Sequence, residues 1–194
     1  VDAMIPVLNP AGVQELLDYG LIGWELSRFS GCWVGLKCMK DTIDASATVE
    51  VSPNRVQVKQ PKDFVLPATG LNIRWPDEPK EQEERLHRFK IDAVRAFARA
   101  NKLDKVVYET KNPRIGVVTC GKSYMDVMQA LQYLGLGERE AGRLGLRVYK
   151  VAMTWPMEPE GLLKFASGLK KIYVIEEKRG LMESQVKEIL YHQK

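Results

Sequence analysis

The sequence is poor in the residues that form disulfides and bind metals. Its 194 residues include three cysteines and two histidines. The cysteines, Cys32, Cys38 and Cys120, are odd in number, and no pair has the C-x-x-C spacing. This pattern favours neither a disulfide framework nor a zinc or iron–sulfur site, so we predict no metal-binding residues. A reducing, cytoplasmic environment fits such a chain best.

Long apolar runs and charge of one sign are also missing. No stretch of about 18 apolar residues occurs, which predicts no membrane span, and no signal peptide is recognisable at the N-terminus. The 29 lysines and arginines alternate with 25 acids, and the net charge is +4. Without a basic stripe, we expect no nucleic acid partner. Because the sequence starts at Val1 rather than at methionine, we expect it to be cut from a longer chain.

The amino-acid composition suffices for a globular core, since 45% of the residues are hydrophobic and 28% are charged. The first region, residues 1–50, opens with the helix-start signal Asn9-Pro10. Apolar residues then recur at helical spacing, namely Leu17, Leu21 and Trp24 in a first helix and Trp33, Leu36 and Ile43 in a second. Two helices without a sheet of their own expose more apolar area than they bury. We expect another polypeptide surface to cover it, most simply in a homodimer.

The second region, residues 51–112, reads as a connector followed by a helix. Valines alternate along 49–58, which predicts short strands there. Prolines then interrupt residues 60–79, and such a stretch is typical of a loop that follows the surface. From 80 to 101 a wide apolar stripe faces a charged side, and this predicts a helix with Asn101 as its C-cap.

The third region, residues 113–194, has the clearest pattern. Apolar runs at 115–119, 146–153 and 172–175 alternate with helical segments. Because these strands are apolar on both faces, they predict a parallel sheet covered by helices on each side, with right-handed crossovers. The predicted fold class is therefore α/β, a three-layer parallel sheet preceded by helices that belong to an adjoining domain.

One motif in this region matches the expression for a phosphate-binding loop, G-x-x-x-x-G-K-[ST]. It runs from Gly116 to Ser123. A true loop needs its first glycine after the strand, whereas Gly116 lies inside a strand-like run. We therefore interpret the motif as a strand, a tight turn and a helix start. The helix N-terminus at Gly121, Lys122 and Ser123 remains a candidate anion site.

The other candidate functional residues have weaker support from the sequence. Glu176 and Glu177 directly follow the third predicted strand, where α/β sheets place functional groups. An acid pair is one interpretation, and helix capping or an interface ion pair is the favoured one. No serine or cysteine has the glycine context of a nucleophile elbow. We predict no catalytic and no cofactor-binding residue in this chain.

Several segments resemble the fused, single-chain indolepyruvate ferredoxin oxidoreductases, which are 2-oxoacid:ferredoxin oxidoreductases. The resemblance covers nearly the whole chain. The segments that carry it are Ile5-Pro6-Val7-Leu8-Asn9-Pro10, Asp18-Tyr19-Gly20-Leu21-Ile22-Gly23-Trp24, Ser30-Gly31-Cys32-Trp33-Val34-Gly35-Leu36-Lys37, Phe64-Val65-Leu66-Pro67, Leu71-Asn72-Ile73-Arg74-Trp75-Pro76-Asp77, Val151-Ala152-Met153-Thr154-Trp155-Pro156 and Val174-Ile175-Glu176-Glu177-Lys178-Arg179.

The resemblance implies a set of domains and a reaction. Residues 1–50 resemble the tail of a pyrimidine-binding thiamine domain, 51–112 a connector, and 113–194 a domain like the C-terminal domain of transketolase. The family decarboxylates aryl 2-oxoacids oxidatively to acyl-CoA and passes electrons through [4Fe–4S] clusters to ferredoxin. It uses thiamine diphosphate, Mg²⁺ and coenzyme A.

The family's catalytic elements do not map onto this chain. The glutamate that activates the thiazolium is expected upstream of Val1, and the element that holds Mg²⁺ and pyrophosphate is expected downstream of Lys194. The resemblance therefore implies a non-catalytic interior fragment, whose partners are the remaining domains, and whose parent enzyme meets ferredoxin. The alternative is a freestanding α/β module that binds an anion or a nucleotide at Gly121 to Ser123.

Overall fold

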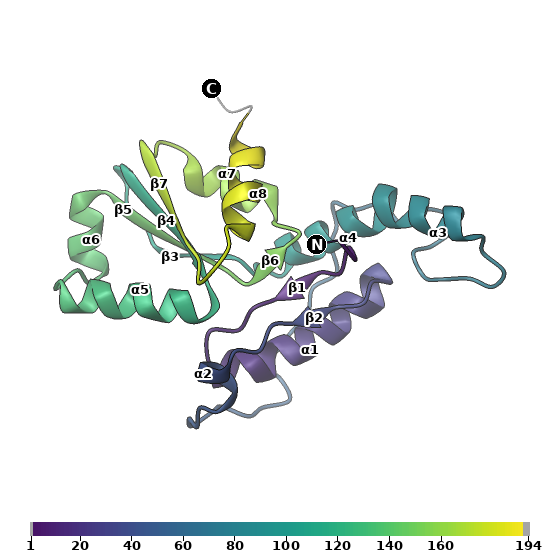
Figure 1. Ribbon diagram of the computed structural model, residues 1–194, viewed down its shortest axis with the longest axis horizontal. Helices are drawn as coiled ribbons and strands as arrows, with labels where there is room; N and C mark the ends of the chain where they lie inside the picture. The colour runs from purple at the N-terminus through teal and green to yellow at the C-terminus, as the bar shows by residue number, and fades with distance from the viewer. Residues whose placement is uncertain (1, 192–194) are drawn as a thin grey trace.

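The third region builds a mainly parallel sheet. A computed structural model describes residues 2–191 (Figure 1). Strand β4 (Ile115–Cys120) pairs in parallel with β5 (Leu146–Val151) on one side and with β7 (Lys171–Ile175) on the other. The predicted parallel strands are thus confirmed. An unpredicted edge strand, β3 (Lys105–Tyr108), pairs antiparallel with β5 and gives the order β3-β5-β4-β7.

Helices cover both faces of this sheet. Side chains alternate across β4, so Val117 packs with α5 (Gly121–Tyr133) and α6 (Glu138–Leu144). Its neighbour Val118 packs on the opposite face, together with side chains of α7 (Pro159–Ala166) and α8 (Leu181–Leu190). Period-two alternation of buried residues requires an apolar layer on each side. The predicted three-layer α/β class is confirmed (Figure 1).

A second, smaller sheet lies beside the first. It has the order β2-β1-β6. Strand β1 (Val7–Leu8) pairs in parallel with β2 (Gly35–Leu36) and antiparallel with β6 (Met153–Trp155). Our expectation that the first region has no sheet of its own is wrong. Strands of two or three residues show no periodicity, and β6 comes from a distant part of the chain, so only long-range pairing defines this sheet.

The first predicted helix exists, but it starts later than expected. Helix α1 (Val13–Ser30) has Gly12 as its N-cap, and it ends at Gly31 with φ +69. Asn9 does not cap it. Instead, the backbone N–H of Asn9 donates to the carbonyl of Ala152 at 2.8 Å, which continues the β1–β6 pairing. A residue held in a sheet is unavailable as a helix cap.

The second predicted helix, over 33–43, is wrong. That segment forms β2 and then one short helix, α2 (Lys40–Ile43). Gly23 of α1 packs on this sheet, because a Cβ there would lie 3.4 Å from Val34 and 3.5 Å from Leu8. The close approach that the glycine permits is therefore to strands rather than to a helix.

The core of this part joins α1, the small sheet and α4. Its fully buried members include Leu8, Leu26, Val94, Phe97 and Met153. Helix α4 (Ile91–Ala100) follows α3 (Pro79–Arg85) and a π-helical turn, η1 (Leu86–Lys90). The predicted helix over 80–101 is confirmed, and so is its cap, since Asn101 Nδ2 donates to the Phe97 carbonyl at 2.9 Å.

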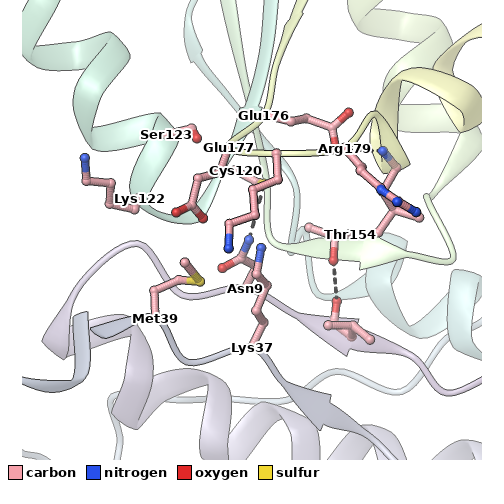
Figure 2. A pocket seen from close by; sticks show the side chains of 13 residues that line it. Asn9, Lys37, Met39, Cys120, Lys122, Ser123, Thr154, Glu176, Glu177 and Arg179 are labelled. Carbon is pink, nitrogen blue, oxygen red and sulfur yellow. Dashed lines mark hydrogen bonds between the residues drawn. The ribbon is translucent and has the colours of Figure 1, made fainter. Parts of the chain in front are cut away.

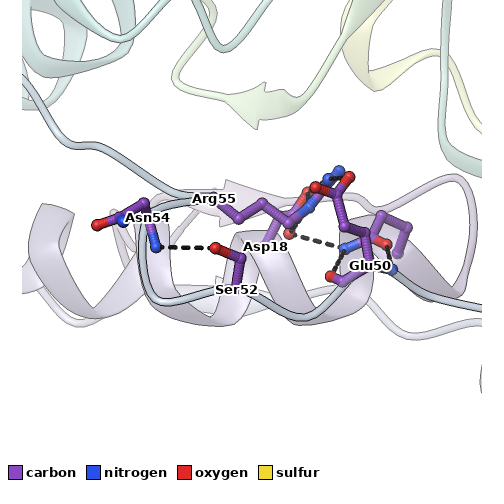
Figure 3. Close-up of polar contacts among 6 residues, drawn as sticks. Asp18, Glu50, Ser52, Asn54 and Arg55 are labelled. Carbon is purple, nitrogen blue, oxygen red and sulfur yellow. Dashed lines mark hydrogen bonds and ion pairs between the residues drawn. The ribbon is translucent and has the colours of Figure 1, made fainter.

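The strands predicted over 49–58 are absent from the described chain. Polar contacts hold this segment along α1 instead (Figure 3). Arg55 bonds Asp18 at 3.0 Å and Glu50 at 2.5 Å, and the Glu50 N–H donates to Gln14 Oε1 at 2.7 Å. Val51 is exposed, so the alternation of valines does not mark a buried face. Over residues 2–191, no helix combines the length and the apolarity that crossing a bilayer demands.

Candidate functional site

A cavity of about 400 Å³ lies where the ends of β4 and β7 meet the small sheet (Figure 2). The carboxyl ends of parallel strands are where open α/β sheets bind ligands. Its lining comes from both sheets and from the loop after β7. The lining residues are Val7, Asn9, Lys37, Met39, Cys120, Lys122, Ser123, Thr154, Glu176, Glu177, Lys178, Arg179 and Leu181.

The first turn of α5 forms one wall of this cavity. The sequence-predicted residues Lys122 and Ser123 line it, and Gly121 makes the turn from β4 with φ +48. No side chain caps the first turn. Backbone N–H groups at the start of an α-helix have no intrahelical acceptor and lie at the positive end of the helix dipole. The first turn of α5 therefore presents donors to the cavity.

Gly116 is a residue of β4, as the interpretation of the motif required. A Cβ at Gly116 would lie 2.5 Å from Leu169 and 2.8 Å from Phe165, so this glycine lets β4 and α7 pack closely. The chain between Gly116 and Gly121 is strand. It cannot wrap a polyphosphate as a true phosphate-binding loop does.

Asn9 forms the floor of the cavity. Its Nδ2 donates to Cys120 Sγ at 3.3 Å, while its Oδ1 has no hydrogen-bond partner among the described residues. Burial raises the pKa of the Cys120 thiol to about 11, and the bond from Asn9 opposes this only in part. A protonated thiol is a poor nucleophile. Cys120 is thus a structural residue of the cavity wall.

Charges of both signs surround the cavity, and the positive ones are more numerous. The cations are Lys37, Lys122, Lys178 and Arg179, and the acids are Glu176 and Glu177. Lys122 forms an ion pair with Asp126 at 2.9 Å. Among residues 2–191, no ion pair within 4.0 Å engages Lys37, Lys178 or Arg179. The sequence missed Asn9, Lys37 and Thr154, because the pairing of β1 with β2 and with β6 brings them here.

Glu176 is a helix cap, as the favoured interpretation held. Its carboxylate accepts the backbone N–H groups of Leu181 at 3.0 Å, Met182 at 2.9 Å and Glu183 at 2.9 Å. These three groups open α8, where the first backbone N–H groups have no intrahelical acceptor. Glu177 lines the cavity and has no such bond.

Replacing Glu176 with alanine should lower the free energy of unfolding by about 1–2 kcal/mol, the usual range for losing a helix N-cap. Urea denaturation followed by circular dichroism measures this. The neighbouring substitution Glu177→Ala is the matched control, and we expect it to change stability by less than about 0.5 kcal/mol. Equal effects of the two substitutions would contradict the capping role.

A second acid, the half-buried Asp104, holds the junction of the two sheets. Asp104 Oδ1 accepts the N–H of Ala152 at 2.7 Å and of Met153 at 3.2 Å, where the chain passes from β5 to β6. Its Oδ2 has no partner among the described residues. Burial raises the pKa of Asp104 to about 7, with a smaller contribution from the nearby charge of Glu158.

Comparisons with known proteins show which proteins this chain resembles. The family described as the indolepyruvate oxidoreductase domain matches residues 105–194. Indolepyruvate oxidoreductase subunit IorA of Methanothermobacter marburgensis is 30% identical over 192 residues, and the match covers 95% of this chain and 28% of that protein. The IorA of Pyrococcus abyssi is 27% identical over 188 residues, with the same coverage.

A solved structure shares the fold. The 2-oxoglutarate:ferredoxin oxidoreductase from Magnetococcus marinus, with 2-oxoglutarate, coenzyme A and succinyl-CoA bound, superposes with a TM-score of 0.57 and 15% identity. The match covers 96% of this chain and 36% of that one. This likeness shows that the two chains share an α/β fold. The indolepyruvate oxidoreductase domain model thus matches the C-terminal part of this chain, which spans 28% of the length of the curated relatives that it matches.

Proposed function

We propose that this chain is a non-catalytic interior part of a cytoplasmic, thiamine-diphosphate-dependent indolepyruvate ferredoxin oxidoreductase. The parent enzyme would decarboxylate aryl 2-oxoacids oxidatively to acyl-CoA and transfer electrons to ferredoxin. The support is the alignment of 95% of this chain with 28% of IorA. The role of this part is domain packing and subunit contact. Its domains would be 1–50, 51–112 and a transketolase-C-like 113–194.

The described residues do not fit the metals of such an enzyme. Within 2–191, no three His, Cys, Asp or Glu side chains are grouped to hold a metal ion. Cys32 and Cys120 are buried and Cys38 is exposed, and none is bonded to another. Iron–sulfur clusters need several thiolates together, and Mg²⁺ needs clustered oxygen ligands. In this proposal the remaining domains of the parent chain supply those ligands and hold the thiamine diphosphate.

An uncovered apolar face on α1 and β2 carries the proposed packing role. We call it the α1 face, and it consists of Leu17, Leu21, Trp24, Trp33 and Leu36. All five side chains are exposed, Trp24 by 66% and Trp33 by 80%. Trp24, Trp33 and Leu36 line one shallow cavity of about 360 Å³. Contiguous exposed apolar surface is uncommon on proteins that act alone and marks interaction sites.

In the 194-residue chain, a homodimer is the simplest way to cover the α1 face, because a two-fold interface lets one patch cover its own copy. We expect light scattering to show a mass that rises from monomer to dimer with concentration. Trp24→Glu should shift the chain to monomer, since it places a charge in the apolar contact. Trp75→Glu is the control, because Trp75 is 97% exposed and does not line the cavity that Trp24, Trp33 and Leu36 form.

A mass equal to one chain at every concentration, unchanged by Trp24→Glu, would contradict the subunit contact. The alternative function, a freestanding anion-binding module, is supported by the cavity at the first turn of α5. The native mass distinguishes the two functions. A native protein of only 194 residues would contradict membership of a longer enzyme.

A further inference from the structure

We propose that the cavity between β4, β7 and the small sheet binds a phosphate group, either as free phosphate or as a phosphate monoester. This inference does not depend on the proposed function, because it rests on the cavity's own donors and charges. Three walls contribute to it. They are the first turn of α5, the small-sheet side with Asn9 and Lys37, and the loop after β7 (Figure 2).

The first wall offers backbone and side-chain donors. Helix α5 is 13 residues long and its first turn is uncapped. The side chain of Ser123 lines the cavity, and the residue is only 8% exposed. No hydrogen bond joins its hydroxyl to a described residue. A hydroxyl without a protein partner beside free helix N–H groups is the arrangement that an anion oxygen satisfies.

The floor of the cavity offers the side-chain amide of Asn9, in which only the nitrogen is hydrogen-bonded. Asn9 is 3% exposed, and its Oδ1 has no partner among residues 2–191. A buried acceptor left without a donor costs stability. The amide turns readily about its terminal torsion, so that either end can face a ligand. Its nitrogen then donates to a phosphate oxygen, and its oxygen accepts from a protonated phosphate or from a hydroxyl of the ester.

The cations converge from separate parts of the chain. Lys37 follows β2, Lys122 belongs to α5, and Lys178 and Arg179 lie after β7. Of these four, Lys37, Lys178 and Arg179 have no ion pair among the described residues. Of the opposing acids, Glu176 already accepts three N–H groups of α8. Glu177 is exposed beside Lys178. The balance around the cavity is therefore positive.

The geometry favours a phosphate over a nucleotide polyphosphate. Donors arrive from three directions, which suits a tetrahedral group with several oxygens rather than a planar carboxylate. A polyphosphate needs a loop that wraps it, and the segment before Gly121 is strand β4. The inferred ligand is thus one phosphate group held at the first turn of α5.

Calorimetric titration of the 194-residue chain tests this. We expect inorganic phosphate and glycerol 3-phosphate each to bind saturably at one site, with a dissociation constant on the order of 1 mM or tighter. Sodium chloride at matched ionic strength should give no such isotherm. Phosphate should also raise the melting temperature, because a ligand that prefers the folded chain stabilises it.

Two variants localise the site. Ser123→Ala should weaken binding about tenfold, as expected for losing a hydrogen bond to a charged group, and it should fold normally because the hydroxyl has no partner. Lys37→Met removes an exposed cation, and we expect about a threefold loss. Lys164→Met is the control, since Lys164 lies on α7 and lines a different cavity. It should bind phosphate as the wild type does.

Three results would overturn the inference. The first is the absence of saturable phosphate binding, and the second is binding that both Ser123→Ala and Lys37→Met leave unchanged. The third is ATP binding much tighter than phosphate and lost in Lys122→Ala, which would show a nucleotide site. ATP that binds no tighter than phosphate supports the inference.

Discussion

Replacing Asp104 with asparagine should abolish a decline in stability that we expect of the wild-type chain as the pH rises from about 4 to 8. Burial raises the pKa of Asp104 in the folded chain to about 7, from its ordinary value of 3.8. Two backbone N–H groups lower this pKa in part, and the charge of Glu158 raises it further. The neutral acid is therefore the form that the folded chain prefers.

The direction of the effect follows from proton linkage. Because the folded pKa is raised, the folded chain holds a proton that the unfolded chain releases between these two values. The stabilisation is fully present below pH 3.8 and is lost as the pH rises through 7. A shift of this size corresponds to about 4 kcal/mol, at roughly 1.4 kcal/mol for each pKa unit.

Urea denaturation at several pH values measures this effect as a difference between two proteins. The unfolding free energy of wild type minus that of Asp104→Asn should fall by about 4 kcal/mol between pH 4 and pH 8. The control is Asp92→Asn, an exposed acid on α4. We expect it to give a difference that is nearly independent of pH. A flat profile for Asp104→Asn would contradict the raised pKa of this carboxyl.

The sequence predicted the elements whose pattern is local. Strands β4, β5 and β7 are mainly apolar runs that alternate with helical segments, so their pattern alone indicates a parallel sheet. The helices over 13–30 and 80–101 show the 3.6-residue period over several turns. Helix α6 escaped prediction because its seven residues, Glu138–Leu144, are mostly charged or small.

The elements that the sequence missed depend on distant partners. Strands β1, β2 and β6 gain their hydrogen bonds only when separate segments meet, and β1 and β6 lie more than a hundred residues apart. For the same reason the site was predicted in part. The glycine, lysine and serine at the start of α5 are adjacent in sequence, and the spacing revealed them. Asn9 and Lys37 join them only through the small sheet.

Gly116→Val should lower the free energy of unfolding more than the other substitutions proposed above, except for the pH-dependent effect of Asp104→Asn. The added Cβ alone would lie 2.5 Å from Leu169 and 2.8 Å from Phe165. Phe165 is fully buried and stacks on Tyr149 with ring centroids 5.0 Å apart, so it cannot move aside freely. Overpacking a close-packed core costs about 1–3 kcal/mol, and valine adds two further methyl groups. We expect a loss of about 3 kcal/mol or more.

Gly20→Ala is the matched control for this substitution. No atom lies within 4 Å of a Cβ at Gly20, which is in the middle of α1, so alanine should stabilise the helix by about 0.5–1 kcal/mol. Urea denaturation at low protein concentration measures both variants. The outcome also separates the two interpretations of the motif. If Gly116 serves packing, the milder Gly116→Ala loses stability but its folded fraction keeps phosphate affinity. If Gly116 belonged to a phosphate-binding loop, affinity would fall while stability held.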